Sequence, residues 1–124
     1  MLTNKTFYPT PKKLIRKMIY KIKKDPAKVL EPSAGKGDIV DELIGTLGGY
    51  DRKYTLENIN TIEIDEDLQA TLRGKGIKVV DTDFLTYSGP DKYDLIIANP
   101  PFDTGDLHLL KAIDIMYRGE IVFL

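Results

Sequence analysis

The chain has 124 residues, of which 42% are hydrophobic, and it contains one histidine and no cysteine. This length fits a single domain, residues 1–124, and the apolar share is that of a folded protein rather than a disordered one. The lack of cysteine excludes disulfides, thiolate zinc sites and thiol nucleophiles, and one histidine excludes a His-rich metal site, so we predict no metal. No apolar run is long enough for a membrane span or a signal peptide, which predicts a cytoplasmic protein.

The formal net charge of −1 hides an uneven distribution along the chain. Residues 1–28 hold nine basic side chains and one acidic side chain, a net charge of +8, whereas the remainder has a net charge of −9. Such a basic segment can contact the phosphates of a nucleic acid, and the candidate contacts are Lys12, Lys13, Arg16 and Lys17. The open alternative is that these side chains only solvate one face of a helix.

Hydrophobic spacing predicts a first helix over residues 10–24, with Thr10 as its N-cap and Pro11 as its first helical residue. Apolar runs then predict strands at 28–30, 58–65, 77–80, 93–98 and 121–124, and helices at 38–47, 66–73 and 106–117. Strands that alternate with helices form parallel sheets through right-handed crossovers. The predicted fold class is therefore α/β, a doubly wound and mostly parallel sheet.

Two stretches of unusual composition follow predicted strands. Residues 31–38 come after the first strand and residues 99–102 after the fourth. In doubly wound sheets, ligands bind beyond the carboxyl ends of the strands, where the strand order reverses. We therefore expect these two stretches to form one functional site.

The first stretch contains a tight glycine turn, Gly35-Lys36-Gly37, which lets the backbone approach a ligand closely. It is not a phosphate-binding P-loop, because its second glycine follows the lysine, and Val40 occupies the third glycine position of a dinucleotide fingerprint. Glu63, after the second strand, can accept two hydrogen bonds from the hydroxyls of a ribose. A nucleoside-containing ligand fits this pattern, and a plain strand-to-helix turn stays open.

The second stretch, Asn99-Pro100-Pro101-Phe102, is more specific. Two prolines make the turn stiff, so the Asn99 amide oxygen and the Pro100 carbonyl can converge as acceptors on one NH₂ group. Drawing both hydrogens of a ring amine out of the ring plane localises its lone pair toward an electrophile, which is preorganised electrostatic stabilisation. Phe102 offers a face on which a planar base can stack, and no strong base is needed.

These motifs make the chain resemble the amino-group (adenine-N6) DNA methyltransferases of the class I, Rossmann-like fold that uses S-adenosylmethionine. The resemblance spans nearly the whole chain, and its motifs occur in the family's order. They are Phe7-Tyr8-Pro9-Thr10-Pro11, Glu31 to Asp38, Ile62-Glu63-Ile64-Asp65, Asp81-Thr82-Asp83-Phe84-Leu85 and Asn99 to Phe102.

The resemblance implies S-adenosylmethionine as the cofactor and assigns a set of side chains to it. Glu63 would bind the ribose hydroxyls, Asp83 would accept from the adenine amine, and Ile64 and Phe84 would pack on the adenine ring. Thr10 would border the methionine moiety. The full set of implied cofactor-binding residues is Thr10, Pro11, Glu31, Ala34, Gly35, Gly37, Glu63, Ile64, Asp83 and Phe84.

The resemblance also implies DNA as the partner and methylation of the adenine amine, as in restriction–modification. Asn99 and Pro100 would hold the target amine and, with Pro101 and Phe102, form the catalytic turn, while a base in a duplex would first be flipped out. Alternatives are a methyltransferase acting on RNA or on a protein glutamine, and a non-catalytic cofactor-binding or nucleic-acid-binding remnant. His108 is expected to have a structural or surface role.

The family fold has seven strands and usually a separate target-recognition region, whereas about five strands are predicted here. We therefore expect residues 1–124 to be part of a longer protein or a short relative. Alone, they should bind the cofactor but barely methylate duplex DNA. Residues 121–124 should lie at an exposed sheet edge, which favours self-association.

Overall fold

The computed structural model describes residues 9–48 and 54–124, so Phe7 and Tyr8 of the first motif lie outside the described residues. Within these residues five strands form one sheet in the order β3-β2-β1-β4-β5. Every neighbouring pair is parallel. The strands are β1 (Val29–Glu31), β2 (Ile59–Ile62), β3 (Lys78–Asp81), β4 (Leu95–Ala98) and β5 (Glu120–Phe123).

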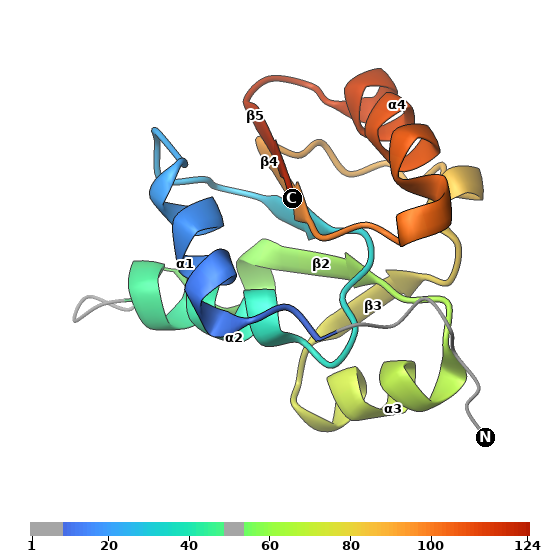
Figure 1. Ribbon diagram of the computed structural model, residues 1–124, viewed down its shortest axis with the longest axis horizontal. Coiled ribbons are helices and arrows are strands. Elements are labelled where there is room, and N and C mark those ends of the chain that lie inside the picture. Colours follow the sequence, from blue (N-terminus) through green and yellow to red (C-terminus); the bar gives the residue numbers. More distant parts are fainter. Residues whose placement is uncertain (1–8, 49–53) are drawn as a thin grey trace.

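Four α-helices of the described residues connect or precede these strands, as Figure 1 shows. They are α1 (Lys12–Tyr20), α2 (Asp38–Leu47), α3 (Glu66–Gly74) and α4 (Gly105–Ile115), with short 3-10 turns η1 (Leu56–Asn58), η2 (Phe84–Thr86) and η3 (Phe102–Thr104). None of the helices described is both long enough and apolar enough to cross a membrane. The α/β, doubly wound prediction is confirmed, and the strand order reverses between β1 and β4.

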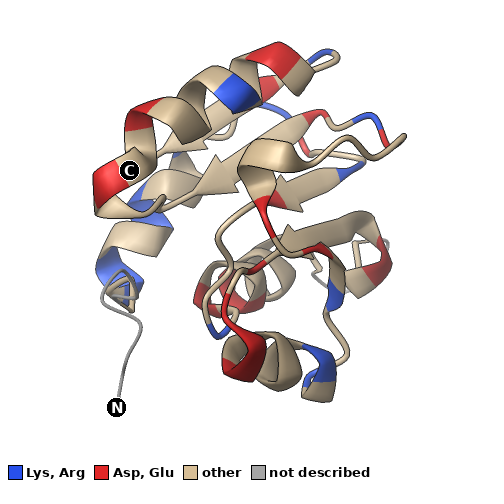
Figure 2. Ribbon diagram, turned by 90° about the vertical axis from the view of Figure 1, so that its right-hand side faces the viewer, with Lys and Arg blue, Asp and Glu red and all other residues tan. Residues whose placement is uncertain are grey.

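The first helix is shorter than the predicted span 10–24. It begins after Pro11, which is the N-cap and has no side-chain cap hydrogen bond, so the prediction of Thr10 as the N-cap is wrong. At the other end, the backbone N–H groups of Lys23 and Lys24 donate to the Glu120 carboxylate at distances of 3.0 to 3.3 Å. Since those N–H groups bond a distant strand, the helix ends at Tyr20. Basic side chains occur along α1 and acidic ones do not (Figure 2).

Most other predicted bounds differ from the observed ones by one or two residues. The predicted strand 58–65 is the exception, because only Ile59–Ile62 pair as a strand. Asn58 instead belongs to η1, where its side chain accepts from the backbone N–H of Thr55 at 2.7 Å. At the far end, the Glu63 and Asp65 carboxylates accept from backbone N–H groups and turn the chain into α3.

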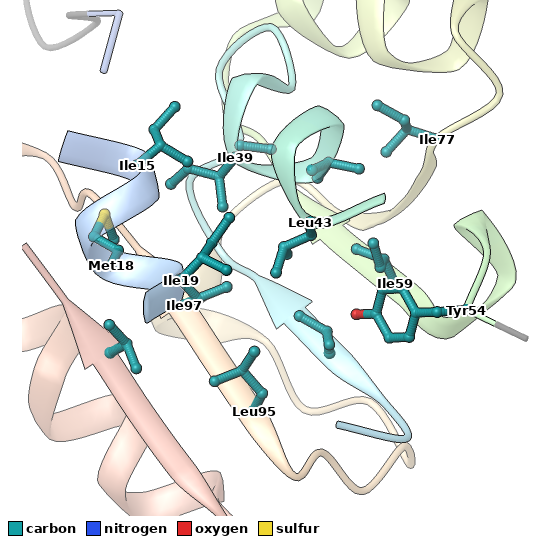
Figure 3. Packing of buried hydrophobic residues seen from close by; sticks show 14 of the residues in the cluster. Ile15, Met18, Ile19, Ile39, Leu43, Tyr54, Ile59, Ile77, Leu95 and Ile97 are labelled. Carbon is teal, nitrogen blue, oxygen red and sulfur yellow. The ribbon is translucent and has the colours of Figure 1, made fainter. Parts of the chain in front are cut away.

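Apolar side chains cover both faces of the sheet. On one face, Ile15 and Met18 of α1 and Leu43 of α2 pack over Val29 and Leu95 (Figure 3). A second cluster on the opposite face joins β1, β4, η2 and α4, and contains Leu30, Ile96, Phe84 and Ala112. Because β1 and β4 are fully buried between these clusters, their carboxyl ends are held rigidly.

Among the described strands, β5 pairs only with β4, so one side of it is an edge. We predict that the chain self-associates through this edge, because unpaired backbone groups of an edge strand accept another strand. Leu124, which is 53% exposed next to β5, is the position to change. Leu124→Lys should shift the chain toward monomer in analytical ultracentrifugation.

Leu107→Lys is the matched control, since Leu107 is 48% exposed on α4 rather than on the strand. It should leave the self-association constant unchanged. A wild-type chain that sediments as a monomer at high concentration would contradict the prediction.

Candidate active site

A cavity of about 320 Å³ opens at the carboxyl ends of the strands, around the point where the strand order reverses. It is bordered by the turn after β1, by the residues after β2 and β3, and by the turn after β4. Nine of the sequence-predicted site residues line it: Thr10, Ala34, Gly35, Glu63, Ile64, Asp83, Phe84, Asn99 and Pro101. The fold thus brings both unusual stretches to one place.

Five predicted site residues do not line this cavity. Glu31 is fully buried at the end of β1, and Pro11 precedes α1. Gly37 begins α2 in a left-handed conformation (φ +96°), where a Cβ atom would lie 2.9 Å from the Ile77 side chain, so the position needs glycine for the turn itself. Pro100 lies in the turn after β4, and Phe102 is 90% exposed next to the cavity.

The Glu63 carboxylate joins the turn after β1 to the residues that follow β2. Its Oε1 accepts from the backbone N–H of Gly35 at 2.8 Å, and its Oε2 accepts from that of Asp65 at 2.9 Å. The Gln69 amide donates to the Glu63 carbonyl at 2.7 Å and fixes the backbone as well. Each carboxylate oxygen keeps a lone pair for a further donor. Burial raises the pKa of Glu63, while the N–H donors oppose the rise.

Glu31 differs from Glu63 in having no partner. Both of its carboxyl oxygens are buried without a hydrogen bond from any described residue. Burial and the nearby Glu63 carboxyl hold the pKa of Glu31 well above its usual range. A buried acid without a donor destabilises the ionised form, and a cation bound nearby would relieve this.

The Asn99 amide is held from one side only. Its Nδ2 donates to the Thr10 hydroxyl at 3.1 Å, and its backbone carbonyl accepts from the Ser33 hydroxyl at 3.2 Å. The Asn99 Oδ1 and the Pro100 carbonyl accept no hydrogen bond from the described residues. The turn therefore has two acceptors at the end of β4 that are not used by the described residues. The Thr10 hydroxyl, expected as a helix cap, instead orients Asn99.

Apolar surfaces and an acid follow β2 and β3. Ile64 is 66% exposed at the cavity, and Phe84 is buried beside it. Asp83 accepts from the backbone N–H of Leu85 at 3.0 Å through Oδ1 and thereby caps η2. A planar heterocycle between apolar walls, with a carboxylate at its edge, fits this part of the cavity.

His108 lines the same cavity, which the sequence did not predict. The imidazole is buried, its Nδ1 lies 2.8 Å from the Thr104 carbonyl, and its ring centroid lies 5.5 Å from that of Phe84. A structural or surface role was expected; the burial of His108 excludes the surface role, and its packing on Phe84 agrees with a structural one. The only sequence signal for this placement was the four-residue spacing of His108 from Thr104, which closely follows the Asn99-Pro100-Pro101-Phe102 turn.

Curated relatives match the chain over most of its length but over little of their own. The modification methylase CviBIII of Paramecium bursaria Chlorella virus NC1A is 32% identical over 60% of this chain and 19% of the relative. The type II methyltransferase M.HincII of Haemophilus influenzae is 36% identical over 75% of this chain and 16% of the relative. The ribosomal RNA small subunit methyltransferase C of Serratia proteamaculans is 33% identical over 76% and 26%. The chain thus spans about a quarter or less of these relatives, and no protein-family model matches it.

Solved structures agree on the fold. The glycopeptide N-methyltransferase MtfA in complex with S-adenosylmethionine superposes with a TM-score of 0.69, covering 99% of this chain and 58% of MtfA at 12% identity. Coclaurine N-methyltransferase superposes with a TM-score of 0.66, covering 90% and 34% at 13% identity. The chain has the Rossmann-like class I methyltransferase fold, and its sequence resembles type II DNA methyltransferases.

The buried carboxyl of Glu31 makes the stability of the chain pH-dependent. The folded state holds the Glu31 proton to a higher pH than the unfolded state does, so unfolding is increasingly favoured as pH rises above 4.5. The slope is at most about 1.4 kcal/mol per pH unit. Glu31→Gln cannot ionise and should therefore lose less stability than the wild type between about pH 5 and pH 8 in urea unfolding.

The control for this comparison is Glu66→Gln, which removes an exposed carboxyl from the first turn of α3. Its stability should follow the wild-type pH dependence. Parallel pH profiles for the wild type and Glu31→Gln would refute the assignment.

Proposed function

We propose that the chain is the cofactor-binding and catalytic part of a methyltransferase. It would transfer a methyl group from S-adenosylmethionine to the exocyclic amine of a nucleic-acid base, with adenine N6 in DNA as the first candidate. The observation that carries the proposal is the Asn99 amide, fixed through Nδ2 by Thr10 and free at Oδ1, at the mouth of a cavity that also contains Glu63 and Asp83. The turn that would bind the amine and the wall that would bind the nucleoside both contribute residues to this cavity.

The residues present fit S-adenosylmethionine. Its sulfonium and ammonium groups are cations, and a cation beside the buried, unpartnered Glu31 carboxyl would offset the burial that raises the pKa of this group. Glu63, anchored by Gly35 and Asp65, would accept from the ribose hydroxyls with its remaining lone pairs. Asp83 would accept from the adenine amine, and Ile64 and Phe84 would enclose the ring. When bound, the cofactor would supply an electrophilic methyl carbon on sulfur.

The chain's own part in the reaction would be to orient and polarise the target amine. Asn99 Oδ1 and the Pro100 carbonyl would accept its two hydrogens and thereby direct the nitrogen lone pair toward the methyl group. The amine so held would accept the methyl group that the cofactor supplies, leaving the C–S electron pair on sulfur, and would release one N–H proton to water. Phe102, exposed beside the turn, would stack on the target base.

DNA is favoured over other substrates because two of the relatives described above are a modification methylase and a type II methyltransferase. RNA is the second candidate, since a relative of similar identity is named as a ribosomal RNA methyltransferase. The motifs that the chain carries serve either polymer, because they contact the cofactor and one base.

Loss of Glu63 should weaken cofactor binding. Glu63→Ala removes the charged acceptor for the ribose and should reduce the affinity for S-adenosylmethionine by about tenfold to 150-fold in calorimetry, corresponding to about 1.5–3 kcal/mol. The control is Glu57→Ala, since Glu57 is an exposed carboxyl in η1. Circular dichroism checks that both variants fold. Unchanged affinity, or binding of NADH instead, would sink the cofactor assignment.

Loss of Asn99 should stop methyl transfer without stopping cofactor binding. With labelled S-adenosylmethionine, we expect transfer to adenine in a single-stranded oligonucleotide and negligible transfer to a duplex, where flipping costs a few kcal/mol. Asn99→Ala should lower the rate by about 10² to 10³. Thr10→Val, which removes the acceptor of Asn99 Nδ2 but keeps the amide, should have a smaller effect.

Equal losses in both variants would mean that Asn99 acts only by holding Thr10. Label in cytosine alone would contradict adenine as the target, and faster labelling of an RNA oligonucleotide would replace DNA by RNA.

A further inference from the structure

We infer that the solvent-facing side of α1 is a docking surface for the phosphate backbone of the nucleic acid. The surface, called here the α1 ridge, consists of Lys13, Lys17, Tyr20 and Lys21. That its partner is a nucleic acid rests on the proposed function, whereas the ridge itself rests on the charges and contacts of α1.

Helical spacing places the three lysines on one side. They are four residues apart, so they lie one above another at intervals of about 6 Å along the helix. The opposite side of the helix contains Ile15, which is buried in the core. One side of α1 is therefore buried in the core, and the α1 ridge is the side that is exposed to solvent.

The structure separates the basic residues of α1 into two groups. Lys12 and Arg16 face α2 and pair with the Glu42 carboxylate at 3.7 and 3.3 Å. Lys13 and Lys17 make no ion pair with any described residue. Of the four candidate contacts that the sequence offered, the two unpaired lysines can therefore bind phosphate without breaking an existing pair, and Lys21 adds a third charge.

Tyr20 is the most exposed large hydrophobic side chain among those described, at 92%, and lies among these cations. Together with Lys13, Lys17 and Arg16 it lines a shallow depression on the outer side of α1. An aromatic ring between cations suits a single strand, because a base stacks on the ring while lysines contact the flanking phosphates.

The ridge begins next to the active site. Thr10, two residues before the start of α1, lines the cavity and bonds Asn99. The nine-residue helix is about 14 Å long, and each strand of a duplex carries a phosphate about every 3.4 Å along the axis. A nucleic-acid strand lying along α1 would thus place several of its phosphates next to the helix while one end of the strand reaches the cavity. Figure 2 shows that acidic side chains do not interrupt this path along α1.

Binding of labelled random-sequence DNA, measured by fluorescence anisotropy over a series of salt concentrations without cofactor, tests the ridge. The triple variant Lys13→Gln, Lys17→Gln, Lys21→Gln should weaken duplex binding at least about tenfold near 100 mM KCl and should flatten the slope of log K against log salt by about 2 to 3. Tyr20→Ala should weaken single-stranded binding by about fivefold or more with little change in slope.

Matched controls separate position from net charge. Lys92→Gln, Lys111→Gln and Arg118→Gln together remove the same charge away from α1, and Tyr117→Ala removes another exposed aromatic, 61% accessible. Both should leave binding near the wild-type value. The pair Lys12→Gln and Arg16→Gln should cost less per charge than the triple variant, because those cations already pair with Glu42.

A triple variant that behaves like its charge-matched control would overturn the ridge. So would tighter binding to phosphatidylserine vesicles than to DNA, which would make the surface a membrane contact. Because no assay here uses turnover, failure of the ridge is distinguishable from failure of methyl transfer. If methyl transfer depends on Asn99 but DNA binding does not depend on the ridge lysines, only this inference fails. If DNA binding depends on those lysines but no methyl transfer occurs, only the proposed reaction fails.

Discussion

The hydrogen bond from the Gly35 backbone to the Glu63 carboxylate is the contact on which the site depends. It joins the turn after β1 to the end of β2, and the second carboxylate oxygen holds Asp65 at the start of α3. A carboxylate that accepts two backbone donors is fixed in direction, so its remaining lone pairs point to one place. The strands that carry this contact are held rigidly, because β1 and β2 are buried between two apolar clusters.

The two carboxyl groups at the ends of β1 and β2 differ in their hydrogen bonding. Glu63 is stabilised by its donors, but Glu31, one strand away, has none. Burial raises the pKa of both carboxyls, and the nearby Glu63 carboxylate raises that of Glu31 further. The cavity wall and the strand end beneath it therefore contain carboxyl groups, whereas α1 contains four basic residues and no acidic one.

The sequence predicted the fold well because its signals were local. Apolar runs marked the strands, and glycine and proline marked the turns next to them, so the order of elements followed. The errors arose where distant residues decide: Glu120 ends α1 by accepting from Lys23 and Lys24, and Asn99 draws Thr10 away from a capping role. His108 was missed as a cavity residue because its placement depends on how α4 packs on Phe84.

Asn99 contacts both sides of the cavity. Its carbonyl accepts from Ser33 in the cofactor-side turn, and its amide donates to Thr10 at the base of α1. A residue shared in this way can link the binding of two ligands. Such linkage is reciprocal: if the first ligand changes the affinity for the second by some factor, the second changes the affinity for the first by the same factor. Under the proposed function, filling the pocket next to Ser33 and binding a strand along α1 would therefore be thermodynamically coupled, with Asn99 as the residue that the two sites share.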